Sequence, residues 1–311
     1  MKIALIDIDG HHFPNIPLMK LSAWHKENGD SVEWYNPIFC EKMDIVYMSK
    51  IFSFTDDYPF PVYADKIVKS GSGYAIKVVD GKEIYDKSAD VNLPYEIEHI
   101  FPDYSLYPDL TKDTAYGFLT RGCPRNCEFC HVGIKEGKCS VKVADLSEFW
   151  NGQKNIVLCD PNLIACREWK DLIQQLIDSK AYIDINQGID IRLMTEEKAE
   201  MISRLKVKAV HFAWDRYDEK DIILPKLQMF KGITNWNYRK MTVFVLVNFD
   251  TTFEQDLERV YTLRDMGFNP YIMVYNKFGT ERKSNIRKLQ RWVNNRMIFR
   301  SVPTFDEYLK K

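Results

Sequence analysis

Apolar runs alternate with segments of helical periodicity through residues 114–300. The run 241–247 is almost continuously apolar, which is typical of a strand buried on both faces of a parallel sheet. Residues 167–178 instead repeat their apolar positions at the spacing of a helix. The pattern predicts six strand–helix units. The expected strands are 115–121, 155–159, 182–186, 208–214, 241–247 and 270–275, and the expected helices are 167–178, 196–205, 219–230, 253–266 and 281–295.

Residues 1–74 carry a shorter version of the same alternation. The first helix should stop at Asn28-Gly29, a common helix-ending pair. Strand and helix alternation of this kind predicts a small, doubly wound parallel sheet. The expected fold class is therefore α/β, in two domains. The strands of the first domain are expected at 2–8, 31–35, 44–48 and 67–69, and its helices at 18–27 and near 61–66.

Residues 75–113 separate the two patterns. Their prolines and aromatic residues exclude a long helix or a central strand. We expect a linker in which Tyr104 and Tyr107 serve packing. The expected organisation is a first domain at 1–74, a linker at 75–113, a second domain at 114–300 and a C-terminal tail at 301–311.

Composition requires neither a nucleic acid nor a membrane as partner. With 311 residues, 45% of them hydrophobic, the chain is able to bury a large core. A formal net charge of −1 gives no overall attraction to nucleic acid or to an acidic membrane surface. The apolar runs are shorter than the roughly 18 residues that a membrane-spanning helix needs. The N-terminal segment alternates apolar and acidic residues like a strand, so we expect a cytoplasmic protein.

Three of the seven cysteines, Cys123, Cys127 and Cys130, have the spacing C-x3-C-x2-C. In a cytoplasmic protein such a dense cluster indicates a metal site rather than a disulfide framework. A structural zinc ion needs four ligands, so it would require His131 or Cys139 as the fourth. An iron–sulfur cluster held by three thiolates would instead keep one iron open. Both kinds of centre suit these residues.

A strand that leads into C-x3-C-x-aromatic-C, with Phe129 as the aromatic residue, resembles the signature of the radical S-adenosylmethionine (radical SAM) enzymes. The resemblance covers the strand–helix units and implies a partial (β/α)6 barrel. It implies a 4Fe-4S cluster on the three cysteines, with S-adenosyl-L-methionine (SAM) chelated at the open iron and Phe129 near its adenine. Such an enzyme splits SAM reductively to a 5′-deoxyadenosyl radical that abstracts hydrogen from a substrate. Its electron would come from a flavodoxin- or ferredoxin-like donor.

The first domain resembles the vitamin B12-binding domain that precedes many radical SAM barrels, in its strand order and in the segment Phe13-Pro14-Asn15-Ile16-Pro17-Leu18. The cobalamin motif of that domain is D-x-H-x-x-G, and here Pro14 stands where the glycine belongs, after Asp9 and His11. We therefore expect a degenerate domain that does not bind cobalamin. A cobalamin-dependent radical SAM methyltransferase, with His11 as axial ligand, stays open as an alternative.

Polar residues follow the expected strands of the second domain, where parallel barrels place their working residues. The family often has Gly-Gly-Glu after the second strand; this chain has Asp160, whose carboxylate would accept from the SAM ammonium. Arg192 would bind the SAM carboxylate, because a guanidinium matches it bidentately. Gln187 and Asn248 are candidates for ribose or substrate, and Asp215 for the cofactor. The same strand ends also supply Asn162, Asp190, Tyr275 and Asn276.

The other cysteines limit the number of clusters to one. Only Cys40 precedes the motif and no cysteine follows Cys166, unlike methylthiotransferases and peptide-maturing radical SAM enzymes, which carry further cysteines. We expect Cys139, Cys159 and Cys166 to be reduced packing thiols.

A basic segment at residues 277–300 bears on the substrate. Trp292 and Phe299 are interleaved with its charges, a combination that occurs on nucleic-acid surfaces and equally on a solvated helix face with Trp292 turned inward. The predicted function is a radical SAM enzyme, and the alternative outside enzymes is a zinc- or nucleic-acid-binding module. The basic residues are Lys277, Arg282, Lys283, Arg287, Lys288, Arg291, Arg296 and Arg300, against the single acid Glu281.

Overall fold

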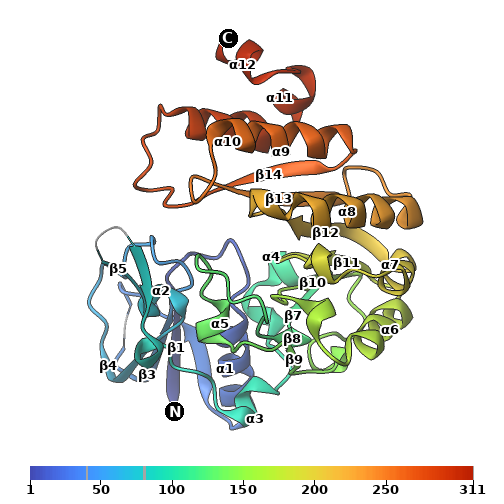
Figure 1. Ribbon diagram of the computed structural model, residues 1–311. Coiled ribbons are helices and arrows are strands. Elements are labelled where there is room, and N and C mark those ends of the chain that lie inside the picture. The colour runs from blue at the N-terminus through green and yellow to red at the C-terminus, as the bar shows by residue number, and fades with distance from the viewer. Residues whose placement is uncertain (40, 80–81, 311) are drawn as a thin grey trace. The chain divides into compact units, whose positions relative to one another are not determined.

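The computed structural model describes residues 1–39, 41–79 and 82–310, so Cys40 and Lys311 lie outside the described residues. The chain divides into two compact units, and the elements are labelled in Figure 1. Unit 1 comprises Met1–Gly117 and Ala144–Ile156, and unit 2 comprises Phe118–Val143 and Val157–Lys311. Unit 1 therefore extends beyond the expected boundary at residue 74 and includes the segment expected to be a linker.

Unit 1 contains a four-stranded sheet in the order β2-β1-β3-β4, with every neighbouring pair parallel. Its central strands are the most apolar, and Ile3, Ala4 and Leu5 of β1 are fully buried. Helix α1 begins after Asn15, whose side chain accepts a hydrogen bond from the backbone N–H of Leu18. The bounds are Lys2–Asp7 for β1, Ile16–Glu27 for α1, Ser31–Trp34 for β2, Met43–Ser49 for β3 and Ala64–Ser70 for β4.

The helix expected near 61–66 is wrong, because β4 begins inside that range. Two features explain the strand. Prolines at positions 59 and 61 bias their preceding residues toward extended backbone. The β-branched pair Ile67 and Val68 then favours a strand over a helix.

The segment expected to be a linker is folded into short elements. As the prolines predict, it holds no long helix among the described residues. Tyr104 donates from its hydroxyl to the carbonyl of Phe149 at 2.6 Å, and the buried Tyr107 donates to Asp7 Oδ2 at 2.8 Å, so both tyrosines serve packing as expected. The elements are α2 Ser72–Ala75, the antiparallel pair β5 Ile76–Val79 and β6 Lys82–Tyr85, η1 Lys87–Ala89, α3 Tyr95–Glu98, η2 Tyr104–Leu106 and α4 Pro108–Thr111.

The larger sheet has six strands in the order β14-β13-β12-β11-β10-β7, so strands that follow one another along the chain are neighbours. The pairs β11–β12, β12–β13 and β13–β14 are parallel. The predicted run 241–247 coincides with β13 Met241–Val247, almost entirely buried as expected. The other strands are β7 Thr114–Gly117, β10 Asn155–Leu158, β11 Tyr182–Ile185, β12 Lys206–Ala213 and β14 Asn269–Val274.

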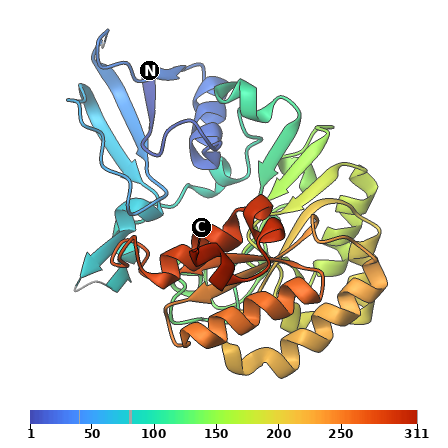
Figure 2. The ribbon, with the colours of Figure 1, turned by 90° about the horizontal axis from the view of Figure 1, so that it is seen from above.

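Helices follow the later strands of this sheet at the predicted places. Thr195 caps α7 through a hydrogen bond from the backbone N–H of Lys198, and a capping box of Thr252 and Gln255 starts α9. Helix α9 packs on β13 and β14, and Figure 2 shows α8 and α9 (gold to orange) along the outer side of the strands. The helices are α6 Trp169–Ser179, α7 Glu196–Ser203, α8 Lys220–Thr234, α9 Phe253–Asp265 and α10 Asn285–Asn294.

The expected strand 115–121 is divided in the structure. β7 ends at Gly117, and β8 Thr120–Arg121 pairs antiparallel with β9 Val141–Lys142. The carboxylate of Asp160 accepts from the backbone N–H groups of Leu119 and Thr120. Because these N–H groups are already bonded, they take no part in the ladder of the larger sheet.

The C-terminal residues are packed and are not a tail. Helices α11 Arg296–Ser301 and α12 Phe305–Leu309 end the described chain, and Phe305 is buried. Trp292 is fully buried and donates from Nε1 to the carbonyl of Val302 at 3.1 Å, while Phe299 is 1% exposed. The two aromatic residues of the basic segment therefore face the core. The segment keeps its basic residues but does not expose these rings beside them, as a nucleic-acid surface would. In the described part of the chain, no helix combines the length and the apolar character needed to cross a membrane.

A candidate metal centre at the carboxyl ends of the strands

The cysteine loop, residues 122–130, leaves β8 and precedes the short helix α5 Val132–Lys135. Gly122 has φ +83°, and a Cβ there would lie 2.1 Å from the carbonyl oxygen of Cys139, so only glycine fits. Its N–H donates to Glu136 Oε2 at 3.2 Å, and the N–H of Cys123 donates to the carbonyl of Gly137 at 3.1 Å. The loop is thus fixed at its start by residues 136–139.

The three cysteines of the loop influence one another electrostatically. Burial, together with smaller contributions from the neighbouring Cys130 and Cys123, raises the pKa of Cys127 to about 11. Cys130 is exposed at the surface, yet partial desolvation by its neighbours also raises its pKa. Within the described residues, no three His, Cys, Asp or Glu side chains are grouped closely enough to hold a metal ion. This holds for Cys123, Cys127 and Cys130 themselves, and also when His131 or Cys139 is considered with them.

Asp160 is fully buried directly after β10 and clamps the chain that enters the cysteine loop. Its carboxylate accepts from the N–H of Leu119 at 3.1 Å, and from the N–H and hydroxyl of Thr120 at 2.6 and 2.7 Å. Burial raises its pKa to about 6, against these hydrogen bonds, which lower it. The expectation that Asp160 accepts from the SAM ammonium is corrected, because the carboxylate is closed off and already bonded. Its geometry is that of a positioning residue.

Asn162 was noted in the sequence only as a polar residue after the second strand, and its environment is more informative than that. It is 1% exposed, and its Nδ2 lies 3.5 Å from the sulfur of Cys123. Its Oδ1 is buried without a hydrogen-bond partner. No local pattern indicates this contact, because the two residues are 39 positions apart.

A chain of charges joins the cysteine loop to the ends of β11 and β12. Arg125, inside the loop, donates from Nε to Asp190. Arg192 donates from Nε to Asp190 at 2.7 Å and from one terminal nitrogen to Glu219 at 2.6 Å. Burial raises the pKa of Asp190, but the two arginines outweigh burial and hold this pKa below its usual value. The charge of Arg192 also lowers the pKa of Cys127, against burial, which raises it.

Asp215 follows β12 on the same edge. Burial raises its pKa to about 6, although Arg259 and Arg192 both lower it. Arg259 is fully buried with Asp256 and donates to the carbonyls of Trp214 and Asp215 at 2.7 and 2.9 Å. The charge of Asp215 also raises the pKa values of Cys127 and Cys130.

The ends of β13 and β14 contribute aromatic rings and a turn. Phe129 of the cysteine loop packs edge to face on Phe249, with ring centroids 5.4 Å apart, and Phe249 packs on Tyr275. Asn248, at φ +65°, donates from Nδ2 to the carbonyl of Tyr275 at 3.1 Å. The amide of Asn248 is thus used to shape the loop. Asn276 is exposed and accepts a hydrogen bond within its own turn. Gln187 is also exposed and stays a candidate for binding ribose or substrate.

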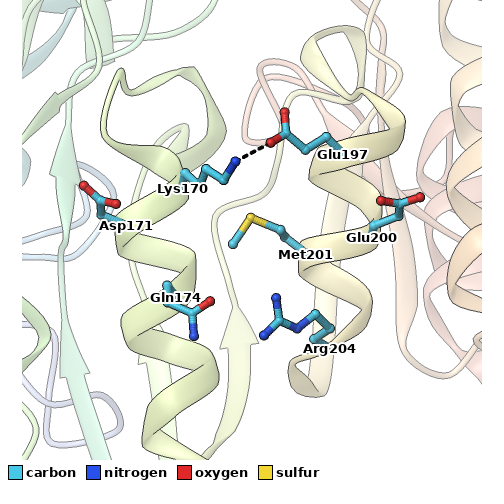
Figure 3. A pocket seen from close by; sticks show the side chains of 7 residues that line it. All are labelled: Lys170, Asp171, Gln174, Glu197, Glu200, Met201 and Arg204. Atoms are coloured by element: carbon cyan, nitrogen blue, oxygen red, sulfur yellow. Dashed lines mark hydrogen bonds and ion pairs between the residues drawn. The ribbon is translucent and has the colours of Figure 1, made fainter.

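Two other features involve other elements of the chain. Figure 3 shows a groove of about 410 Å³ between α6 and α7, crossed by the ion pair of Lys170 and Glu197 at 2.6 Å. Its lining comes from the two helices, and none of the candidate residues contributes to it. In unit 1, His11 packs edge-on against Trp34 at 4.3 Å and near Tyr107.

Comparison of the sequence with known protein families and with curated proteins gave no match in either case.

Proposed function

We propose that the chain is a radical SAM enzyme with one 4Fe-4S cluster, held by Cys123, Cys127 and Cys130. The observation that carries the proposal is the position of the cysteine loop, which shares one edge of a parallel sheet with the polar strand ends of β10 to β12. The sequential strand order supports a partial (β/α)6 barrel, because an open doubly wound sheet reverses its order at a switch point. The working edge of such a barrel is the edge where the strands end.

The donor set fits an iron–sulfur cluster better than zinc. The loop offers three soft thiolate ligands with C-x3-C-x2-C spacing, whereas the described residues contain no group of three or more side chains, these thiols included, that could hold a single metal ion. Zinc in a closed structural site needs four. The N–H donor of Asn162 beside Cys123 is a further match, because hydrogen bonds to the sulfurs are a common feature of iron–sulfur sites.

When bound and reduced, the cluster would supply one electron to the sulfonium of SAM and so produce a 5′-deoxyadenosyl radical. The protein's part is to bind and orient the reactants and to exclude water. Arg192 would exchange its contact with Glu219 for the SAM carboxylate, and Phe129 would lie against the adenine. Asp160 would hold the entrance of the cysteine loop in place. A flavodoxin- or ferredoxin-like protein would deliver the electron.

Anaerobic reconstitution with iron and sulfide, followed by product analysis, tests the proposal. The loaded protein should convert SAM to 5′-deoxyadenosine and methionine when dithionite is added, even without its substrate. Metal analysis of the protein as isolated separates the alternatives by their metals: iron with sulfide, cobalt, or zinc. Stoichiometric zinc with no iron uptake, or an iron-loaded protein that leaves SAM intact, would contradict the proposal.

A further inference from the structure

Asn162 is held at the cysteine loop by two contacts of different kinds. Its side-chain Nδ2 is 3.5 Å from the sulfur of Cys123, and its main-chain carbonyl accepts from the hydroxyl of Ser140 at 2.9 Å. It stands at the start of the short helix η4 Leu163–Ala165, directly after the Asp160 clamp. The side chain is 1% exposed, so water does not compete for its amide.

The amide can face a ligating sulfur in only one way. A thiolate carries no proton, so only the N–H side of an amide can donate to it. The Oδ1 atom then points elsewhere, and the structure leaves it buried and unpaired. A buried acceptor without a partner costs free energy. Stability therefore does not explain why an amide stands here, because an apolar side chain of the same shape would avoid this cost.

We propose that Asn162 is a positioning residue that raises the reduction potential of the cluster by donating an N–H···S hydrogen bond to Cys123. The inference rests on the proposed function and deepens it. Reduction adds negative charge to the cluster and its thiolates, and a hydrogen-bond donor stabilises the reduced form more than the oxidised form. Hydrogen bonds to the sulfurs are among the main determinants of iron–sulfur potentials.

The test compares reconstituted wild type with Asn162→Leu, Asn162→Asp and Ser140→Ala, using midpoint potentials and chemical denaturation. The leucine variant should have a lower midpoint potential than wild type, by ~59 mV, which corresponds to an about tenfold shift of the one-electron equilibrium. Its resistance to urea should stay equal or rise. The aspartate variant should lower the potential further, because it adds a negative charge. Ser140→Ala, which touches only the main chain of Asn162, should leave the potential unchanged.

An independent measurement on the wild type does not depend on the folding of any variant. With nitrogen-15-labelled asparagine, the reduced cluster should show electron–nuclear coupling to an amide nitrogen, and Asn162→Leu should abolish it. Unchanged potentials in both Asn162 variants, or no amide coupling in the wild type, would overturn the inference while leaving the proposed function standing. Failure of the wild type to take up iron and sulfide would instead overturn the proposed function, and this inference with it.

Discussion

Two loops of this protein follow strands of parallel sheets and contain residues that suggest a cofactor, yet their chemistry differs. The β1 loop, residues 8–15, has its polar groups closed by the protein: Asp9 accepts from the hydroxyl of Thr55 at 2.7 Å, and Asn15 donates to Ser49 at 2.9 Å. The cysteine loop instead brings three thiols into electrostatic range of one another beside an amide oxygen that has no partner.

The difference is that the β1 loop bonds its polar side chains to the protein, whereas Asn162, which contacts the cysteine loop, keeps a buried oxygen without a partner. In the β1 loop the cobalamin motif is incomplete, and His11 packs on Trp34 as an ordinary aromatic contact. In the cysteine loop the motif is complete, and the charged network of Asp190 and Arg192 lies next to it. The predictions below test whether the two loops really divide in this way.

The largest effect is expected for the cysteines themselves. Replacing Cys123, Cys127 or Cys130 singly with alanine should remove nearly all iron from a protein that otherwise binds about four irons per chain. Iron and sulfide analysis after anaerobic reconstitution measures this. Cys139→Ala is the matched control, since Cys139 is exposed nearby, and it should keep its iron. Loss of iron in the control would show that the thiol set has been misidentified.

Asp160→Ala should cost about 3 kcal/mol of unfolding free energy, because it leaves buried donors of Leu119 and Thr120 without an acceptor. Urea denaturation measures it. Asp160→Asn keeps one acceptor oxygen and should lose less. If the alanine variant is as stable as wild type, Asp160 does not clamp the loop.

The same residue gives a pH dependence. The pKa of Asp160 rises from 3.8 when unfolded to about 6 when folded, so the folded protein binds more protons between these values. The contribution of this group to stability is complete below about pH 4 and is lost as the pH rises through about 6. The stability of wild type relative to Asp160→Asn should therefore fall between pH 4 and pH 7, and a constant difference would contradict the assignment.

Arg192→Ala should weaken SAM binding about tenfold to a hundredfold, the value of one charge-assisted hydrogen bond. Isothermal titration of SAM against the reconstituted variant measures it, and iron content should not change. Arg216→Ala is the control, because this arginine follows the neighbouring strand β12 and pairs with Asp250 and the exposed Asp218. If wild type and Arg192→Ala bind SAM with equal affinity, the Arg192 guanidinium does not contact SAM and serves only the charge network.

The smallest effect is expected in the β1 loop. His11→Ala should change neither iron content nor SAM affinity, and hydroxocobalamin should show no saturable binding to the wild type in a visible-spectrum titration. One-to-one binding of cobalamin that disappears in the His11 variant would place a ligand in the β1 loop and erase the contrast between the two loops.

Local sequence predicted the elements whose signal is local. The buried run of β13 and the capped helices α7 and α9 lie where the pattern placed them. The expected strand 115–121 failed because a carboxylate 40 residues away takes its N–H groups, and a hydrogen bond at that distance in sequence leaves no periodic signal. The folded state of residues 75–113 was missed because short elements stabilised by tertiary packing have weak patterns.

The candidate site was predicted to a similar extent. Spacing predicted the three cysteines as metal ligands, which stays a prediction, and the ends of strands predicted the neighbourhood of Asp160, Arg192 and Asp215. Their partners were not predictable, because Arg192 meets Glu219 from another strand end and Asn162 meets Cys123 from a distant loop. The first pairing already occupies the guanidinium expected to bind SAM, and the second identifies Asn162 as a donor to Cys123.

The most direct test of the central claim is the electron paramagnetic resonance spectrum of the reduced, reconstituted protein, recorded with and without SAM. A cluster held by three cysteines has an open iron, so SAM binding at that iron should change the spectrum of the reduced cluster. An excess of another molecule that chelates the same iron should prevent this change. A reduced 4Fe-4S signal that SAM leaves unchanged would contradict the account, and so would a protein that acquires zinc and no cluster.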